Sequence, residues 1–306
     1  MSRALVFPGQ GAQYVGMGST LVDLCPAAKA LLASADQVLG FALSEVVLHG
    51  PESELTRTDV SQPAILVTSL MALEALKAKV GTIDFQATAG LSLGEYTALV
   101  AAGAIEAVDA IRLVRLRGQA MQDAATAVPG GMVALIGPDE ATAQKLCETC
   151  AEGEVLQVAN LNSPGQVVIS GAKAACDRAV AKAKEFGIRR ALPLPVAGAF
   201  HSALMATAAD RLQAALAQTR FRDPRVPVYT NVTAQPVTSA AQIPDLLVRQ
   251  LTNPVRWADG VTAMRSAGIT EFWELGPKKT LSGMIAQTAK DAVCKNLDTA
   301  TDLAAF

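Results

Sequence analysis

The chain lacks the features that mark nucleic-acid-binding and membrane proteins. Its 26 basic and 28 acidic residues give a formal net charge of −2 and form no run of like charges, whereas nucleic-acid binders need a basic surface. The apolar stretch over residues 64–73 ends at Glu74 and is too short to cross a bilayer. No signal or transit segment is recognisable before the first apolar strand. We therefore expect a cytoplasmic protein without nucleic-acid or membrane partners.

Cysteines are few and odd in number. The five lie at positions 25, 147, 150, 176 and 294 and make no disulfide framework, which indicates a reducing compartment. Cys147 and Cys150 have the spacing of half a zinc site, but no second Cys/His pair follows, so one turn of an ordinary helix is the favoured interpretation. We predict no metal.

A nucleotide-binding signature is also missing. The loop Pro8-Gly9-Gln10-Gly11 follows a short apolar strand, but it has no Gly-Lys-Ser/Thr ending and no third glycine at dinucleotide-binding spacing. Its glycines allow the backbone to approach a ligand closely. We predict no bound cofactor.

The length and the order of elements predict the fold class. With 306 residues, 51% of them hydrophobic, the chain suffices for a large domain with a smaller one inserted. Over residues 132–194 the expected order is strand, helix, strand, strand, helix, strand, as in a ferredoxin-like module. The flanking segments predict a parallel sheet with helices. We expect an α/β protein: a large α/β-hydrolase-like domain over residues 1–127 and 197–306, and an inserted ferredoxin-like α+β domain over residues 128–196.

Individual elements follow from hydrophobic periodicity and cap residues. One helix is expected over residues 63–79, with Ser61 as its cap and Pro63 in its first turn. Further helices are expected over residues 25–38, 109–125, 139–150, 173–186, 203–218, 243–251 and 280–288. Strands are expected over residues 5–7, 82–89, 132–136, 155–159, 167–170, 188–192, 226–232 and 271–275.

The segment Gly90-Leu91-Ser92-Leu93-Gly94 has the pattern of a nucleophile elbow. Small residues two before and two after the serine let a strand and a helix pack around a sharp turn. A strand is expected before the turn and a helix over residues 93–102 after it, where free backbone N–H groups favour a developing negative charge. The pattern predicts acyl transfer through an ester of Ser92.

A serine nucleophile needs a base, and only two histidines are present. His201 precedes a helix that Ser202 can cap, which places its imidazole at a loop-to-helix junction. His49 is followed by Gly50-Pro51 and is expected in a solvent-exposed turn. We predict that His201 is the base, the alternative being that it only packs at the helix entrance.

No convincing carboxylate partner for the histidine is found at a strand end between Ser92 and His201. Asp139, Glu140 and Asp177 belong to helices of the inserted domain, where solvated faces are expected. A backbone carbonyl can fix the imidazole tautomer in place of a carboxylate.

Arg117 projects from an apolar stripe of the helix expected over residues 109–125. Its neighbours three and four positions away are apolar, whereas Arg112 and Arg115 have each other and Asp109 within one turn. An inward arginine must meet an anion or several acceptors, so it is either a member of a buried ion pair or a clamp for a ligand. Beside a serine nucleophile, a guanidinium suggests an acyl group with a free carboxylate.

With these residues assembled, the chain resembles the malonyl-CoA:acyl carrier protein transacylases. The resemblance covers nearly the whole chain and rests on eight blocks in the family's order. They are Phe7–Gln13, Gln62-Pro63-Ala64, Gly90–Tyr96, Arg115–Gly118, Asn162–Gln166, Phe200–Ser202, Gln250-Leu251 with Asn253-Pro254-Val255, and Glu274–Pro277.

The resemblance implies ping-pong transfer of a malonyl group from malonyl-CoA to the phosphopantetheine thiol of holo acyl carrier protein, in a monomer. Ser92 would attack the thioester, with His201 as base and the Gln250 carbonyl orienting it. The implied roles of the other residues concern the oxyanion and the acyl group. Backbone N–H groups of Leu93 and Gln10 would form the oxyanion hole, Arg117 would bind the malonyl carboxylate, Phe200 would narrow the pocket, and Gln10, Met121 and Asn162 would line the substrate site.

Two positions depart from the family. Leu91 stands where the family often has histidine, which leaves serine activation intact but affects the polar lining near the acyl group. Lys278 stands where glycine is usual. The alternatives are a serine esterase or thioesterase of the α/β-hydrolase type, which the elbow alone permits, and an inactive carrier-binding homologue.

Acyl carrier proteins are acidic, so the resemblance also implies a basic docking surface. Contributors on the small domain are Lys182, Lys184, Arg189 and Arg190; a solvated face explains these residues equally well.

Overall fold

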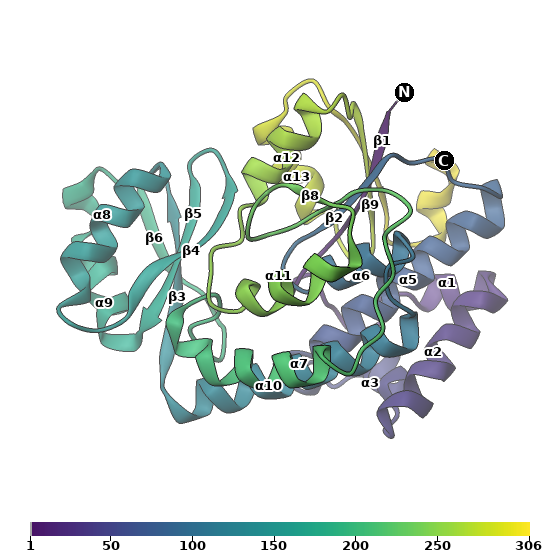
Figure 1. Ribbon diagram of the computed structural model, residues 1–306, viewed down its shortest axis with the longest axis horizontal. Coiled ribbons are helices and arrows are strands. Elements are labelled where there is room, and N and C mark those ends of the chain that lie inside the picture. The colour runs from purple at the N-terminus through teal and green to yellow at the C-terminus, as the bar shows by residue number, and fades with distance from the viewer. Residues whose placement is uncertain (1) are drawn as a thin grey trace.

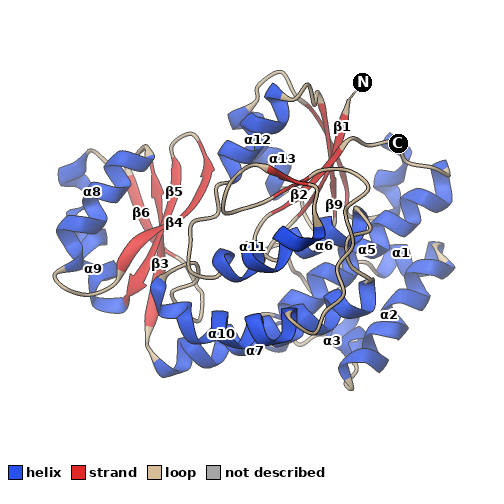
Figure 2. Cartoon of the chain, in the orientation of Figure 1, coloured by secondary structure: helices blue, strands red, loops and turns tan. Residues whose placement is uncertain are grey.

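The computed structural model describes residues 2–306 and contains two β-sheets (Figures 1 and 2). Residue 1, which the predicted large domain includes, lies outside the described residues. In the larger sheet every neighbouring pair is parallel except the last, so the predicted parallel sheet is confirmed. Its strands are, in order, β10 (Val293–Leu297), β9 (Glu271–Leu275), β1 (Arg3–Phe7), β2 (Ala87–Gly90), β7 (Val228–Tyr229) and β8 (Pro236–Val237).

Strand β1 lies inside the larger sheet and is buried on both faces. Leu5 and Phe7 pack in the same core as helices α2 (Pro26–Leu39), α5 (Thr58–Val80) and α7 (Ala107–Ala127). Ala4 and Val6 pack instead with α12 (Trp257–Ser266) and α13 (Thr280–Thr288). Because successive side chains of a strand point to opposite faces, the sheet is covered by helices on both sides.

The smaller sheet is antiparallel and has its own core. Its order is β4 (Leu156–Ser163), β5 (Gln166–Ala172), β3 (Gly130–Ile136) and β6 (Arg190–Pro193). Helices α8 (Glu140–Ala151) and α9 (Lys173–Lys182) complete the predicted strand-helix-strand-strand-helix-strand order. Cys147 and Cys150 lie on α8 and are buried in this core, as the helical interpretation of their spacing expected.

The edge of β4 is joined by backbone hydrogen bonds to Val255, in the segment just before α12. Leu161 N–H donates to the Val255 carbonyl at 2.9 Å, and Val255 N–H donates to the Ala159 carbonyl at 2.9 Å. Helix α10 (Ala206–Leu216) lies alongside α7, and both chain ends lie in the part of the molecule with the larger sheet (Figure 1). Among residues 2–306, no helix combines the length and the apolar character needed to cross a membrane.

The start of the helix expected over residues 63–79 was predicted wrongly. Helix α5 begins at Thr58, so Ser61 is not its cap and Pro63 lies in its interior. Proline has no N–H to donate to the carbonyl of Asp59 four residues earlier. Arg115 on α7 donates to that carbonyl at 2.6 Å, and this contact replaces the missing bond.

The predicted strand over residues 226–232 was also wrong in extent, since only Val228–Tyr229 pairs in the sheet. Pro227 has no N–H to contribute to a ladder. Beyond the strand, the N–H of Asn231 donates to Glu95 Oε2 at 2.9 Å instead of to a neighbouring strand. The sequence therefore had the right apolar pattern, but side-chain chemistry ends the pairing after two residues.

The sequence did not predict six elements, most of which are short. They are α1 (Ser19–Leu24), α3 (Leu43–His49), α4 (Glu52–Leu55), α12, β8 and β10. The helix expected over residues 173–186 ends in the 3₁₀ turn η1 (Ala183–Phe186), and the one expected over residues 203–218 begins with η2 (Ala203–Met205).

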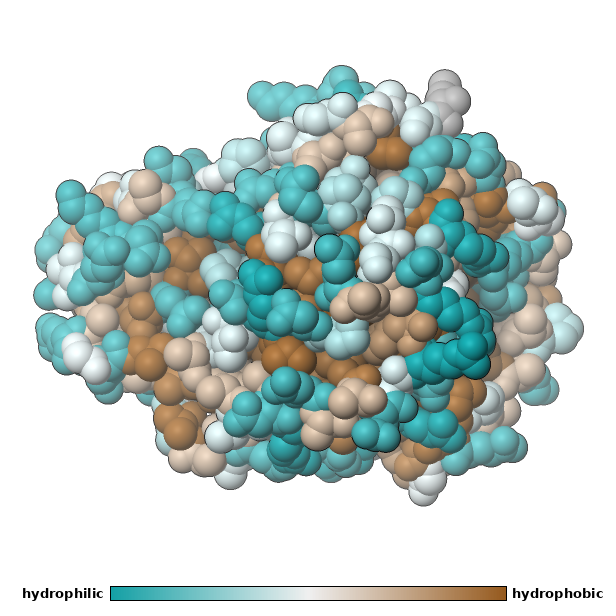
Figure 3. Space-filling model, viewed as in Figure 1, coloured by the Kyte–Doolittle hydropathy of each residue, from teal (hydrophilic) through white to brown (hydrophobic). Residues whose placement is uncertain are grey.

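The visible surface is mostly hydrophilic, with hydrophobic residues in separate patches (Figure 3). Exposed large apolar side chains occur on unrelated elements, for example Leu24, Leu192 and Val293. Of the basic residues considered for docking, Lys184, Arg189 and Arg190 are exposed and Lys182 is half-buried.

Candidate active site

Ser92 occupies a strained turn between β2 and helix α6 (Gly94–Ala101). Its φ is 51°, in the left-handed region, which costs a non-glycine residue about 1–3 kcal/mol. A Cβ on Gly90 would lie 2.0 Å from the Gly94 carbonyl oxygen, and one on Gly94 would lie 2.2 Å from the Phe7 carbonyl oxygen. Only glycine fits at these two positions, and the turn therefore depends on both.

Asn231, which follows β7, holds the turn from the other side. Its Oδ1 accepts the Ser92 N–H at 2.6 Å, and its Nδ2 donates to the Gly90 carbonyl at 2.7 Å. The amide thus bonds both limbs of the elbow. Sequence reasoning missed this residue, because nothing local to position 231 indicates a partner 139 residues away.

His201 lies beside Ser92. Its Nε2 is 2.8 Å from Ser92 Oγ, and its Nδ1 is 2.7 Å from the Gln250 carbonyl oxygen at the end of α11 (Ile243–Gln250). A carbonyl only accepts, so Nδ1 carries the proton and the lone pair of Nε2 faces the serine hydroxyl. His201 also has a left-handed φ of 57°, and the Ser202 side chain caps the following 3₁₀ turn by accepting from Leu204 N–H.

The environment keeps this imidazole neutral. Burial, followed by the charge of Arg117, lowers the pKa of His201 to about 4, although the hydrogen bond to Gln250 opposes the shift. At neutral pH the side chain is therefore in the form that accepts a proton. The other histidine, His49, ends helix α3 instead of lying in the expected turn, and it is exposed.

Arg117 on α7 reaches the same serine. Its side chain is buried, with 1% exposure. Nη2 donates to Ser92 Oγ at 3.0 Å and to Gln250 Oε1 at 2.9 Å, while Nη1 donates to Gln62 Oε1 at 2.7 Å. Within residues 2–306, no carboxylate forms a salt bridge with this guanidinium and its Nε has no hydrogen-bond partner. The structure therefore does not place Arg117 in a direct ion pair.

A carboxylate nevertheless lies close to Arg117, separated from it by the side chain of Gln250. Glu95 on α6 is 2% exposed, and its Oε2 accepts from Gln250 Nε2 and from Asn231 N–H, both at 2.9 Å. Burial raises the pKa of Glu95 to about 7, while these hydrogen bonds and the charge of Arg117 act in the opposite direction. The sequence search overlooked it because it considered strand ends. A glutamate three residues after the nucleophile, on an otherwise apolar helix, was the available signal.

Gln10 and Leu93 border the serine from two segments. Leu93 follows Ser92 directly, and the loop that holds Gln10 touches the elbow, since a Cβ on Gly9 would lie 2.5 Å from the Leu91 carbonyl oxygen. In the described chain the backbone N–H groups of Gln10 and Leu93 donate no hydrogen bond. Two free donors thus flank the nucleophile.

Lys278 supports the Gln10 loop. It has a left-handed φ of 61°, which explains why glycine suits the position. Its Nζ donates to the Gly11 carbonyl at 3.1 Å, and its backbone N–H donates to Asp298 Oδ2 at 2.9 Å.

The other predicted substrate residues divide into two groups. Met121 is buried and its Sδ accepts from Gln62 Nε2 at 3.4 Å, so it lies next to a partner of Arg117. Phe200 is buried immediately before His201. Asn162 lies on β4, and no hydrogen bond among the described residues connects it to Ser92 or its partners. The structure therefore does not bring Asn162 into the hydrogen-bonded group. Leu91 packs against the apolar core shared by β1, α12 and α13.

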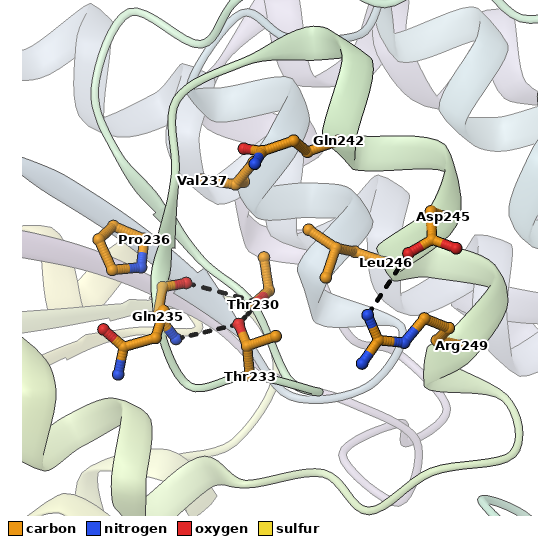
Figure 4. A pocket seen from close by; sticks show the side chains of 9 residues that line it. All are labelled: Thr230, Thr233, Gln235, Pro236, Val237, Gln242, Asp245, Leu246 and Arg249. Atoms are coloured by element: carbon orange, nitrogen blue, oxygen red, sulfur yellow. Dashed lines mark hydrogen bonds and ion pairs between the residues drawn. The ribbon is translucent and has the colours of Figure 1, made fainter.

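A cavity of about 540 Å³ lies nearby, beside α11 and β8 (Figure 4). It contains the pair Asp245–Arg249, with 3.4 Å between Nη1 and Oδ2, and the hydroxyls of Thr230 and Thr233, 2.7 Å apart. None of the residues that line it is among those predicted for the active site.

The buried carboxyl group gives a testable pH dependence of stability. An unfolded glutamate ionises near pH 4.5 and folded Glu95 near 7, so between these values the folded state keeps a proton that the unfolded state has lost. Stability therefore falls as the pH rises through this window, by about 3 kcal/mol in total. Glu95→Gln lacks this titration, and its free energy of unfolding relative to the wild type should rise between pH 5 and pH 8.

Urea denaturation at several pH values measures this difference. Glu45→Gln, at an exposed position on α3, is the control and should show no such rise. A Glu95→Gln difference that stays constant from pH 5 to pH 8 would contradict the burial of an ionisable carboxyl group.

Comparison with known proteins shows a consistent likeness. The model of the acyl transferase domain family matches residues 4–303. A malonyl CoA-acyl carrier protein transacylase of Bacillus subtilis (strain 168) is 46% identical over 283 residues, which cover 92% of this chain and 89% of the relative. The structure of the malonyl CoA-acyl carrier protein transacylase from Coxiella burnetii has a TM-score of 0.96 at 39% identity, with 100% of this chain and 96% of the other covered. A malonyl-transacylase in complex with its type II PKS acyl-carrier protein has a TM-score of 0.95 at 40% identity, with 99% and 98% covered.

Proposed function

The chain belongs to the acyl transferase domain family, and on this premise we propose that it transfers a malonyl group from malonyl-CoA to the phosphopantetheine thiol of holo acyl carrier protein. The transfer proceeds in two half-reactions through a malonyl ester of Ser92. No bound cofactor takes part, because the phosphopantetheine is carried by the partner. The relatives named malonyl CoA-acyl carrier protein transacylase support the substrate and the partner.

One observation carries the proposal. Ser92 Oγ lies 2.8 Å from His201 Nε2 and 3.0 Å from Arg117 Nη2. A nucleophile, a base and a cation that can bind a carboxylate are thus in contact, although they come from three separate parts of the chain.

The chemistry follows from these contacts. The Ser92 hydroxyl attacks the thioester carbon while its proton moves to His201 Nε2, and the charged oxygen that develops is met by the N–H groups of Leu93 and Gln10. Collapse of this intermediate breaks the carbon–sulfur bond, and His201 returns the proton to the leaving thiolate. In the second half-reaction the carrier thiol attacks the serine ester and gives its proton to His201 Nε2. The carbon–oxygen bond of the ester then breaks, and His201 returns the proton to the Ser92 oxygen.

Arg117 provides selectivity for the free carboxylate of the acyl group. Its Nε has no partner among the described residues and is adjacent to Nη2, so this edge of the guanidinium can donate one hydrogen bond to each oxygen of a carboxylate. Met121 and Phe200 are proposed to line the acyl site, with Phe200 excluding branched groups. We retain Asn162 as a proposed substrate contact at the small sheet, made only when substrate is bound.

The architecture of the enzyme is part of the proposal. We propose that residues 1–127 and 197–306 form a large domain that shares the strand–serine turn–helix unit of the α/β-hydrolases. Residues 128–196 form the smaller inserted domain, and the protein acts as a monomer.

Arg117→Ala is expected to weaken the use of malonyl-CoA far more than that of acetyl-CoA. Loss of charge-assisted hydrogen bonds removes about 1.5–3 kcal/mol, which is roughly a tenfold to hundredfold fall in kcat/KM for malonyl-CoA. Arg112→Ala on the same helix is the control, because Arg112 is exposed and forms a salt bridge with Asp109, away from Ser92. An equal loss for both acyl groups would refute the clamp.

Transfer and hydrolysis distinguish the proposal from its alternatives. The protein is mixed with malonyl-CoA, with and without holo acyl carrier protein, and malonyl carrier and free malonate are measured. We expect malonyl carrier, and little malonate when the carrier is omitted. Fast release of malonate without a carrier thiol would indicate an esterase. Binding of the carrier without any acyl transfer would indicate an inactive homologue.

A further inference from the structure

Glu95 is a buried carboxyl group that contacts the candidate active site, and the mechanism above does not use it. Its Oε2 accepts two hydrogen bonds of 2.9 Å, from the side chain of Gln250 and from the backbone of Asn231. Both donors also hold Ser92: Gln250 Nε2 bonds to the Ser92 carbonyl at 3.0 Å, and Asn231 Oδ1 accepts the Ser92 N–H. One carboxyl group therefore anchors two residues that fix the nucleophile.

The Gln250 amide also connects Glu95 to Arg117. Its Nε2 donates to Glu95 Oε2, and its Oε1 accepts from Arg117 Nη2 at 2.9 Å. A buried cation without a counter-charge is unfavourable. The Arg117 guanidinium has no direct carboxylate partner in the described chain, and Glu95 is the carboxylate whose charge acts on it, across the neutral amide of Gln250.

We propose that Glu95 is a positioning residue that balances the charge of Arg117 in the unacylated enzyme and takes up a proton from solvent when the malonyl carboxylate reaches Arg117. This inference rests on the proposed malonyl transfer. A substrate carboxylate brings a second negative charge into a site that already holds one of each sign. Protonation of the Glu95 carboxylate restores the balance, and the proton returns to solvent when the malonyl group leaves on the carrier.

Glu95 has a pKa near neutrality, whereas its titratable neighbours Tyr96 and His201 do not. From α7 it faces Arg117, and from α11 and the segment after β7 it meets the neutral amides of Gln250 and Asn231. Tyr96 on its own helix has a pKa raised by burial and stays neutral, and His201, beyond the Gln250 carbonyl, has a pKa lowered to about 4. The pKa of Glu95, raised to about 7, is the one near neutrality.

The test is a measurement of proton uptake during acylation. Wild-type protein in weakly buffered solution at pH 7.5, with a pH indicator, receives one equivalent of malonyl-CoA or of acetyl-CoA, and intact mass gives the acylated fraction of the same sample. Both reagents release the same thiol, so the difference isolates the effect of the carboxylate. We expect malonylation to take up roughly half a proton per acylated enzyme more than acetylation, the amount for a group of pKa near 7 raised by one unit.

Glu95→Gln is the matched variant, because its amide oxygen can still accept both hydrogen bonds while the charge is removed. It should form the malonyl adduct without the additional proton uptake. At pH 8 its preference for malonyl-CoA over acetyl-CoA should rise on the order of tenfold, because Arg117 then lacks a competing negative charge. A role confined to packing would change neither readout.

The outcomes separate this inference from the proposed function. A wild-type malonyl adduct that forms with no more proton uptake than the acetyl adduct overturns the role of Glu95 and leaves the transferase intact. This comparison needs no variant and decides the matter even if Glu95→Gln fails to fold. Absence of any adduct in the wild type contradicts the proposed function, and the role of Glu95 with it.

Discussion

Replacing Ser92 with alanine is expected to abolish the acyl-enzyme and to reduce malonyl transfer by about 10⁴–10⁶-fold. The ester can form only on the hydroxyl oxygen that lies 2.8 Å from His201 and 3.0 Å from Arg117. Without it the oxyanion donors and the substrate contacts remain, and they cannot replace a covalent intermediate. Transfer to holo acyl carrier protein, followed with labelled malonyl-CoA, measures the loss.

Ser53→Ala is the control for this substitution. Ser53 lies exposed on α4, and its replacement should leave the rate unchanged. Thermal unfolding of both variants checks that the fold is retained. Transfer that persists in Ser92→Ala within tenfold of the wild type would move the nucleophile to another residue.

The second large effect is expected for His201→Ala, which should slow acylation by about 10²–10⁴-fold. The substitution removes the imidazole placed to take the serine proton, while Ser92 keeps its bonds to Arg117 and Asn231. The rate of ester formation in a single turnover measures the effect. His49→Ala removes the other histidine at an exposed helix end and should have no effect.

The wild-type pH profile provides a further check on this histidine. Burial and Arg117 lower the pKa of His201 to about 4, so acylation by acetyl-CoA should fall less than about twofold between pH 7.5 and pH 5.5. An unperturbed imidazole with a pKa near 6.5 would instead lose about tenfold of its rate at pH 5.5. A tenfold loss would show that the ring is solvated in the working enzyme.

Much of the site could be predicted from short sequence patterns because the chemistry restricts the choice of residues. The glycines around Ser92 are required by a turn that leaves no room for a side chain. With two histidines in the chain, the choice of a base was short. Arg117 stood out because its helical neighbours are apolar, and the structure places it against the serine.

The residues behind this site could not be predicted in the same way. Asn231 and the side chain of Gln250 act through bonds to Ser92 and Glu95 that span 136 to 158 residues. The resemblance implied a role for the Gln250 carbonyl but not for its side chain, and it implied none for Asn231. Glu95 is polar on an apolar helix, which local periodicity treats as an irregularity. The role proposed for Glu95 depends on Arg117, and the Gln250 amide links the two side chains by hydrogen bonds.

The fold shows the same division between local pattern and distant contact. Strands β1 and β9 of the larger sheet and the six-element small module follow the apolar periodicity. Helix α5 begins at Thr58 and contains Pro63 in its interior, where Arg115 donates a hydrogen bond to the carbonyl that the proline leaves without an N–H partner. The strand at Val228–Tyr229 is short because Asn231 bonds to a side chain and not to the sheet.

Intact mass of the wild-type protein after mixing with malonyl-CoA, with no carrier present, tests the central claim most directly. The account predicts a gain of one malonyl group, located by peptide mapping on the segment that contains Ser92 and lost when holo acyl carrier protein is added. An unchanged mass, or a malonyl group on any other residue, would contradict it.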